Sequence, residues 1–245
     1  MSNPSSKLWC YGIPGAGKTV LASSVIQEAL RHSSPNIAVA FFYCDYKIAE
    51  TQDPKSILGS IVKQLAVQDE QSFEKLQTFF ESKNPKDLPR VDFSLEELRD
   101  LVVTMTSNFD DVMFIVDALD ECGTAKQIRL VTRLLTSLND GRDAGNSKTL
   151  FLSRDEPDIR EILENYDHIS IAASSSDLRF YVGAEIELRT RNRDLRIKDP
   201  NLKEQIMARL VEGADGMLVD KISAIFLLSR LLSLPLRSNC TTLVG

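Results

Sequence analysis

Five short apolar runs alternate along this chain with amphipathic stretches of helical spacing. The runs are LWCY (8–11), NIAVAFFYC (36–44), VMFIVD (112–117), TLFLS (149–153) and HISIA (168–172). An unbroken apolar run such as VMFIVD is typical of a strand that is buried on both sides in a parallel sheet. We therefore expect an α/β fold of the P-loop NTPase type, with a five-stranded, mainly parallel sheet and helices on both of its faces. From Ser174 onward the pattern predicts a helical segment.

Capping signals mark where several of the intervening helices begin. Asp53-Pro54 predicts a helix start in the N-cap and first-turn manner. A capping box formed by Ser94 and Glu97 predicts another, with its apolar residues on one face. A second amphipathic stretch covers about 70–82, and a third apolar stripe runs through 128–138.

The stretch GIPGAGKT, residues 12–19, fits the pattern of a phosphate-binding loop, and it follows a predicted strand and opens a predicted helix. Glycines let backbone N–H groups approach phosphate oxygens, and the helix N-terminus adds partial positive charge. Lys18 supplies a full charge for the β- and γ-phosphates, and the Thr19 hydroxyl can ligate Mg²⁺. The predicted nucleotide-binding residues are Gly12, Ile13, Pro14, Gly15, Ala16, Gly17, Lys18 and Thr19.

A group of acidic residues ends the third apolar run, in the sequence MFIVDALDEC. Asp117 lies 99 residues after Lys18, at the carboxyl end of the predicted strand, where open α/β sheets bind their ligands. We expect Asp117 to hold Mg²⁺, directly or through water. Asp120 and Glu121 follow within one turn, and either can orient or deprotonate an attacking water. The alternative is that the acidic pair caps the next helix.

Arg154 follows the next predicted strand, in TLFLSRDEPDI, on the same edge of the sheet. A cation at this place can interact with the γ-phosphate and respond to its loss on hydrolysis. The alternative is a surface arginine that pairs with Asp155 or Glu156.

Three blocks together resemble the NACHT domain of fungal NOD-like (STAND-class) P-loop NTPases, and more narrowly its nephrocystin-like modules in ankyrin or other repeat proteins. The blocks are WCYGIPGAGKTVLASSVI, FIVDALDEC and LFLSRDEPDI, and the resemblance covers about 7–216. It implies a nucleotide-dependent switch, in which ATP or GTP with Mg²⁺ favours an open, self-associating state and slow hydrolysis resets it. Carried over, residues 12–19 bind phosphates, Asp117 holds Mg²⁺, Asp120 or Glu121 positions water, and Arg154 is the sensor.

The C-terminal part departs from this family. Members usually continue after GADGM (213–217) with an aromatic-containing helix and a winged-helix lid, whereas this sequence continues LVDKISAIFLLSRLL. We therefore expect a truncated or aberrant C-terminus, with effector and repeat domains missing. The expected organisation is a nucleotide-binding domain at 1–173, a helical extension at 174–217 and an atypical tail at 218–245.

Composition and charge exclude several other classes of protein. A net charge of −6 argues against nucleic acid as a partner, since nucleic-acid binding needs a basic surface. No apolar run approaches the length of a bilayer span, and the N-terminus has no signal peptide, so we expect a cytoplasmic protein with no membrane partner. The four cysteines form no CxxC pair, which excludes a zinc site of the usual spacing and gives no disulfide framework.

Three functions remain open. The first is a signalling NTPase that hydrolyses nucleotide slowly and changes its assembly state. The second is an ordinary P-loop ATPase or small-molecule kinase, although no LSGGQ signature occurs in the chain. The third is a degenerate interaction module that folds without turnover. Hydrolysis with no phosphoryl acceptor, transfer to a small molecule, and binding without turnover would distinguish them.

Overall fold

The computed structural model describes residues 7–83, 92–138, 146–171, 175–193, 195 and 199–214. The chain divides into two compact units. The first comprises 1–12 and 18–171, and the second comprises 13–17 and 172–245. The predicted tail at 218–245 lies outside the described residues.

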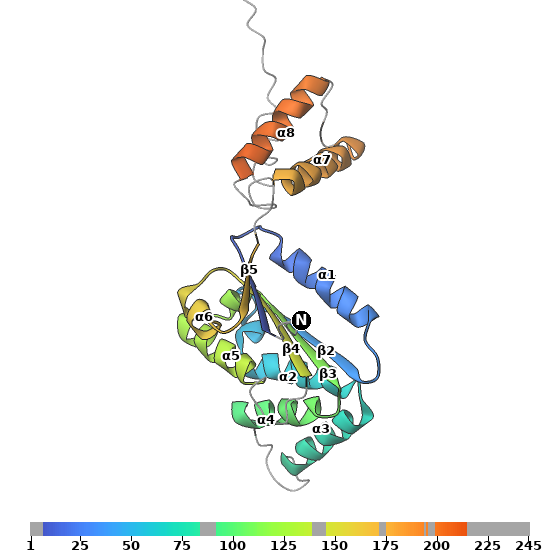
Figure 1. The fold of residues 1–245 in the computed structure, drawn as a ribbon, viewed down its shortest axis with the longest axis vertical. Helices are drawn as coiled ribbons and strands as arrows, with labels where there is room; N and C mark the ends of the chain where they lie inside the picture. Colours follow the sequence, from blue (N-terminus) through green and yellow to red (C-terminus); the bar gives the residue numbers. More distant parts are fainter. Residues whose placement is uncertain are drawn as a thin grey trace, which may run out of the picture. The chain divides into compact units, whose positions relative to one another are not determined.

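The first unit is built around a five-stranded sheet (Figure 1). Its strands are β1 (Lys7–Tyr11), β2 (Ile37–Tyr43), β3 (Asp111–Asp117), β4 (Asn146–Ser153) and β5 (Asp167–Ser170). They lie in the order β2-β3-β4-β1-β5, and all neighbouring strands are parallel. The predicted P-loop α/β fold is therefore confirmed. The fifth strand is an edge strand whose residues are exposed, and it covers Asp167–Ser170 where 168–172 was predicted.

The strand order decides which loops meet at the carboxyl edge of the sheet. β4 lies between β1 and β3, with Tyr11 opposite Ser153 and Val116 opposite Phe151. Because the strands are parallel, the segments that follow β1, β4 and β3 emerge side by side. These segments begin at Gly12, Arg154 and Ala118.

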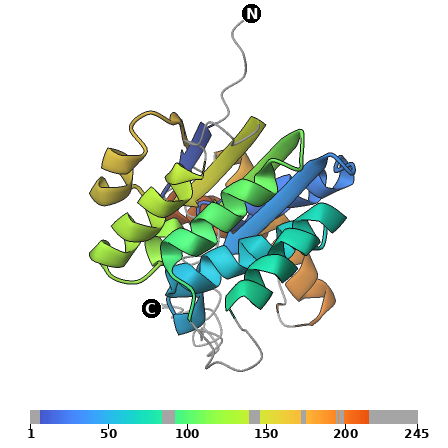
Figure 2. The same ribbon diagram turned by 90° about the horizontal axis from the view of Figure 1, so that it is seen from below.

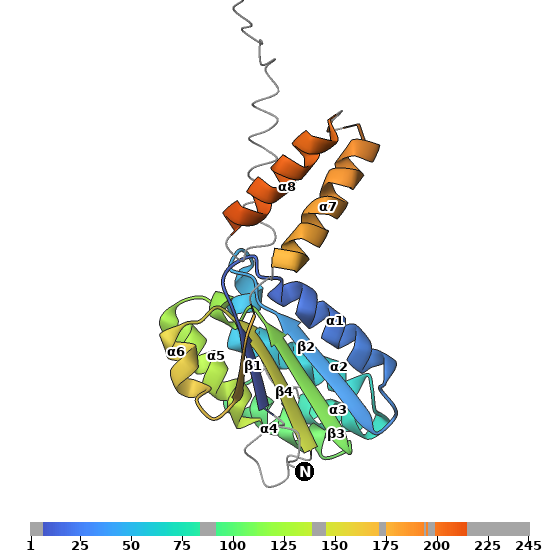
Figure 3. The ribbon, with the colours of Figure 1, turned by 45° about the horizontal axis from the view of Figure 1, so that its top comes forward.

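Helices cover both faces of this sheet, in unequal numbers (Figures 2 and 3). One face packs against α1 (Lys18–Arg31), with Cys10, Val39 and Ile115 from the strands meeting Ala22 and Ile26. The opposite face carries the larger core, where Trp9 and Phe114 pack with residues of several helices. These helices are α2 (Pro54–Ala66), α3 (Glu70–Lys83), α4 (Leu95–Thr106), α5 (Ala125–Ser137) and α6 (Pro157–Ile162). Successive strand residues thus enter opposite cores, as the period of two requires.

The predicted caps are present. Asp53 accepts a hydrogen bond from the backbone N–H of Ser56 at the start of α2, and Ser94 and Glu97 form the capping box of α4. α5 has its own capping box at Thr124, so the acidic pair Asp120 and Glu121 does not cap it. That pair lies instead in a short 3₁₀ turn, η2 (Leu119–Glu121). Another 3₁₀ turn, η1 (Ala49–Gln52), follows β2.

The described part of the second unit includes two helices, α7 (Ser175–Arg191) and α8 (Pro200–Ala214). They pack against each other through a small core of Val182, Ile186 and Leu210, in agreement with the helical pattern expected after Ser174. Across the described residues, none of the helices is both long and apolar enough to cross a bilayer.

Candidate functional site

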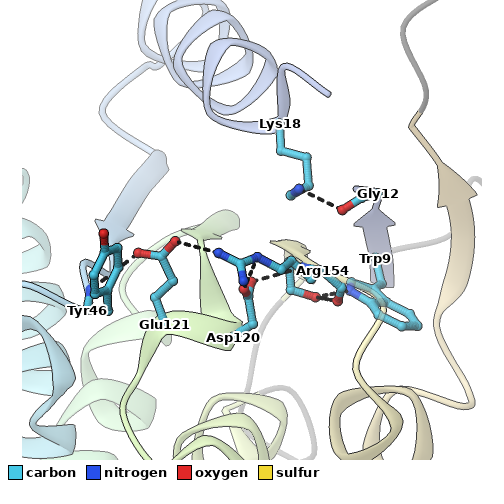
Figure 4. Close-up of polar contacts among 8 residues, drawn as sticks. Trp9, Gly12, Lys18, Tyr46, Asp120, Glu121 and Arg154 are labelled. Carbon is cyan, nitrogen blue, oxygen red and sulfur yellow. Dashed lines mark hydrogen bonds and ion pairs between the residues drawn. The ribbon is translucent and has the colours of Figure 1, made fainter. Parts of the chain in front are cut away.

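The end of β1 and the start of α1 are held together around Gly12. Its backbone N–H donates to the carbonyl of Ser153 at 3.3 Å, and its own carbonyl accepts from Lys18 Nζ at 2.7 Å (Figure 4). A Cβ at this position would lie 2.2 Å from the carbonyl oxygen of Ile171. Gly12 is therefore required by the approach of the chain after β5, a reason that the motif alone does not reveal.

The loop between Gly12 and Lys18 contains two residues in the left-handed region of backbone space. Gly15 has φ 71° and Gly17 has φ 90°, conformations that strain any residue with a Cβ. The backbone N–H of Ala16 donates to the carbonyl of Ile13 at 3.3 Å and closes the turn. The glycines at these two positions are thus explained by conformation.

Asp117 ends β3 with its carboxylate buried; the residue is 2% exposed. Burial raises the pKa of this carboxyl, and the Thr19 hydroxyl, the Ala118 backbone N–H and the charge of Lys18 oppose the rise. Its Oδ1 has no hydrogen-bond partner among the residues that the structure describes. An orphaned buried carboxylate oxygen beside a hydroxyl suits Mg²⁺, which prefers such ligands, so Thr19 and Asp117 are the residues that would hold the ion.

Lys18 contributes a partly desolvated cation to the same edge of the sheet. Burial lowers the pKa of its ammonium, and the charges of Asp120, Asp117 and Glu121 act in the opposite direction. A lysine that has already lost part of its hydration binds an anionic group at a smaller desolvation cost.

Asp120 makes two contacts with Arg154. Its Oδ1 accepts from the backbone N–H of Arg154 at 2.9 Å, and its Oδ2 lies 3.2 Å from the guanidinium Nε (Figure 4). The Asp120 side chain is only 6% exposed, whereas that of Arg154 is 46% exposed. The predicted alternative for Arg154 is wrong, because its partners are Asp120 and Glu121, and Asp155 pairs with Arg160.

Glu121 is more loosely held than its neighbour. Its Oε1 lies 3.7 Å from Arg154 Nη2, and its Oε2 accepts from the backbone N–H of Tyr46 at 3.3 Å. Tyr46 belongs to the loop after β2, which is fixed by hydrogen bonds from the Thr51 hydroxyl to the Asp45 carbonyl and from Gln52 Nε2 to the Tyr46 carbonyl. No motif in the sequence indicates this loop, although Asp45 directly follows the predicted strand at 36–44, on the same sheet edge.

The turn that presents these acids contains a strained residue. Ala118, between Asp117 and the 3₁₀ turn, has φ 56° and ψ 42°, in the left-handed region. For a residue with a Cβ this conformation costs about 1–2 kcal/mol. The small side chain keeps the cost low, and the bend sends the chain from the end of β3 toward Arg154.

A buried relay joins Arg154 to the core. Trp9 Nε1 donates to Ser153 Oγ at 2.8 Å, and Ser153 Oγ donates to the carbonyl of Arg154 at 2.7 Å (Figure 4). Trp9 is fully buried and is the one tryptophan of the sequence. We therefore expect its fluorescence to respond when the backbone at Arg154 moves, and no sequence motif indicates the relay.

The structure thus brings together five charged residues and the Thr19 hydroxyl, which influences the pKa of Asp117. The five are Lys18, Asp117, Asp120, Glu121 and Arg154. Ile13 to Gly17 belong to the second unit. The chemical role of each of these site residues stays a prediction.

Comparison with known proteins gives a family match. The model of the family described as "Nephrocystin 3, N-terminal" matches residues 1–154. The vegetative incompatibility protein HET-E-1 of Podospora anserina is 28% identical over 222 residues, which cover 85% of this chain and 15% of that protein. The chain therefore spans about 15% of the length of this curated relative.

Solved structures show more distant similarity. A DNA replication initiation factor has a TM-score of 0.47 at 12% identity, over 91% of this chain and 54% of that chain. The Drosophila ORC bound to DNA has a TM-score of 0.47 at 15% identity, over 95% of this chain and 51% of that chain. The chain thus spans about half the length of each.

Proposed function

This chain belongs to the nephrocystin 3 N-terminal family, and on that premise we propose that it binds a nucleoside triphosphate together with Mg²⁺ and hydrolyses it slowly. The proposal leaves the base, adenine or guanine, to the experiment below. One observation carries it: the carboxylate at the end of β3 is buried at 2% exposure, and its Oδ1 has no hydrogen-bond partner among the described residues. The glycine loop precedes the Thr19 hydroxyl directly in the sequence.

The binding roles follow from charge and position. Residues 12–19 would surround the phosphates, with Lys18 exchanging its bond to the Gly12 carbonyl for phosphate oxygens. Thr19 and Asp117 would hold the Mg²⁺ ion, which supplies positive charge against the phosphate oxygens when bound. The raised pKa of Asp117 reflects a buried carboxylate that the charge of Lys18 stabilises only in part.

Glu121 is the residue that we assign to the attacking water, and Asp120 is the residue that holds Arg154. Glu121 is 23% exposed on its side chain and has only long contacts, whereas Asp120 is nearly buried and doubly bonded. In the reaction, the water oxygen bonds the γ-phosphorus while the bond from that phosphorus to the bridging oxygen breaks. The water proton passes to Glu121.

The same contacts suggest how bound triphosphate changes the site. The guanidinium of Arg154 lies 3.7 Å from Glu121, and a γ-phosphate is a stronger partner for it than this distant carboxylate. Arg154 would therefore turn toward the phosphate and release Glu121 for the water. After hydrolysis and phosphate loss it would return, which is the response expected of a sensor.

We propose further that turnover serves as a signalling or assembly switch, as the NACHT resemblance implies. In this proposal the domain at 1–173 carries the chemistry, 174–217 forms a helical extension, and the protein works in the cytoplasm. Its partners would be the nucleotide, further copies of the chain and proteins reached through effector and repeat domains.

The test is a titration of the purified chain with fluorescent ATP and GTP analogues, with and without Mg²⁺, with phosphate release followed in the same sample. We expect Mg²⁺-dependent binding, slow release of phosphate and a change in Trp9 fluorescence. Lys18→Ala should abolish binding, because the cation for the phosphates is lost. Glu121→Gln should bind as the parent does and release phosphate at least tenfold more slowly.

The matched control for Lys18→Ala changes an exposed lysine away from the site. Lys63→Ala, on an exposed position of α2, should leave affinity and turnover unchanged. Retained affinity in Lys18→Ala would refute the phosphate-binding assignment. Binding without phosphate release would favour a non-catalytic module, and transfer of phosphate to a small molecule would favour a kinase.

A further inference from the structure

Two buried cysteines meet beside the candidate site. Cys44, directly after β2, and Cys122, directly after η2, have their Sγ atoms 2.8 Å apart. Cys44 is 5% exposed and Cys122 is 0% exposed, and both are free thiols. We propose that this pair is a modification site, at which a peroxide oxidises the two thiols to a reversible intrachain disulfide.

Backbone hydrogen bonds hold both cysteines in place. The Cys44 N–H donates to the Asp117 carbonyl at 3.1 Å, which ties the end of β2 to the end of β3. The Cys122 N–H donates to the Leu119 carbonyl at 3.4 Å and closes the 3₁₀ turn. A disulfide has an S–S distance of about 2.05 Å, so the two sulfurs, 2.8 Å apart, need to approach by about 0.8 Å.

The reaction balances with hydrogen peroxide as the oxidant. One thiolate attacks a peroxide oxygen, forming a sulfenic acid while the O–O bond breaks and one water leaves. The second thiol then attacks the sulfenic sulfur, forming the S–S bond and releasing a second water. Two thiols and one peroxide thus give one disulfide and two waters, and a dithiol reductant reverses the change.

The environment makes the pair slow to react. The hydrogen bond to Cys122 and burial both raise the pKa of the Cys44 thiol, and the charges of Asp117 and Asp120 add to the rise. A protonated, buried thiol is a poor nucleophile. The pair therefore reacts with peroxide more slowly than an exposed thiol does.

The crosslink would act on the contact between Tyr46 and Glu121. Tyr46 lies two residues after Cys44, and Glu121 directly precedes Cys122, so the disulfide ties together the two segments that share this hydrogen bond. On the proposed function, which this consequence rests on, the oxidised chain would hydrolyse nucleotide more slowly because Glu121 is kept from the water. The formation of the disulfide itself does not depend on nucleotide.

The experiment uses the full 245-residue chain, reduced, desalted and then treated with hydrogen peroxide. After quenching, denaturation and alkylation, the reduced chain should carry four alkyl groups, one on each cysteine. The oxidised chain should carry two alkyl groups. Trypsin should then give peptides 32–47 and 100–126 joined together, and dithiothreitol should separate them. We expect this linkage to exceed any other cysteine pairing at least tenfold.

A matched variant tests whether Cys44 and Cys122 are the linked pair. Cys10→Ser removes another buried cysteine, from the opposite face of the sheet, and should leave the linkage intact. Cys44→Ala should abolish it; should that variant fail to fold, the peptide map of the parent decides. The proposal is overturned if both thiols of the folded chain survive prolonged treatment with a peroxide excess that oxidises the same cysteines in the denatured chain, or if either sulfur forms sulfinic acid without the crosslink. A crosslink with no nucleotide binding would keep this proposal and refute the proposed function.

Discussion

Gly12→Ala tests how closely the chain after β5 approaches the start of the glycine loop. The added Cβ would lie 2.2 Å from the Ile171 carbonyl oxygen and 3.2 Å from its carbonyl carbon. Both are backbone atoms, which cannot rotate away as the end of a flexible side chain would. Ordinary contact begins near 3.4 Å, so the two segments must separate by about 1.2 Å.

The cost of that separation has two parts. Forcing an extra carbon into a packed site costs about 1–3 kcal/mol. The movement also strains the hydrogen bond from the Ile171 N–H to the Tyr11 carbonyl, which is 2.6 Å long and whose loss costs about 0.5–1.5 kcal/mol. Since β5 is an edge strand and can yield, we expect a loss of about 2–4 kcal/mol in the free energy of unfolding. For a chain of this size the corresponding fall in Tm is about 4–16 °C.

The same substitution at Gly59 should have the opposite sign. Gly59 lies inside α2, and a Cβ there would meet nothing within 4 Å. Alanine in a helix interior is favoured over glycine by about 0.5–1 kcal/mol, so the Tm of Gly59→Ala should rise by about 1–4 °C. Thermal unfolding followed by circular dichroism compares the two variants with the parent. A Gly12→Ala variant as stable as the parent, or equal losses in both, would refute the reasoning.

Two further variants test the neighbouring acids. Asp120→Ala should lower the free energy of unfolding, measured by urea denaturation, by about 1.5–3 kcal/mol, because the backbone N–H and the guanidinium of Arg154 lose their acceptor. The control is Asp155→Ala, which removes a well exposed carboxylate and should lower the free energy of unfolding clearly less. Equal losses in the two variants would contradict the claim. Asp117→Asn should remove the Mg²⁺ dependence of binding. It should also be more stable than the parent at neutral pH, because the folded parent disfavours the buried charge. Folding raises the pKa of Asp117 above its usual value of 3.8. The difference in stability between Asp117→Asn and the parent should therefore be absent below pH 3.8 and widen as the pH rises above it. A difference that is constant from about pH 3 to 7 would contradict this direction of the pKa shift.

Much of the fold could be predicted from the sequence because its signals are local. The unbroken apolar run before Asp117 is the buried strand β3, and the capping box at Ser94 starts α4 where expected. The nephrocystin-like resemblance is confirmed by the family match over residues 1–154. These features depend on hydrophobic period and capping chemistry, which are read within a few residues.

The contacts that define the site could not be predicted in this way. Arg154 and Asp120 are 34 residues apart, and Cys44 and Cys122 are 78 apart, so neither pair leaves a local pattern. Both depend on the strand order, in which β4 lies between β1 and β3 and β2 lies beside β3. Periodicity predicts that strands exist but carries no information on which strands are neighbours.

Two adjacent carboxylates with the same chemistry acquire different roles from their surroundings. Asp120 is nearly buried, and each of its two carboxylate oxygens contacts Arg154, so accepting a proton from water would weaken these two contacts. Glu121 is more exposed, and its contacts of 3.3 and 3.7 Å are weak enough to give up. The adjacent pair therefore separates into a residue that positions the arginine and a residue that can accept a proton. Had β1, rather than β4, been the neighbour of β3, Arg154 would not meet Asp120, and this difference between the acids would not arise.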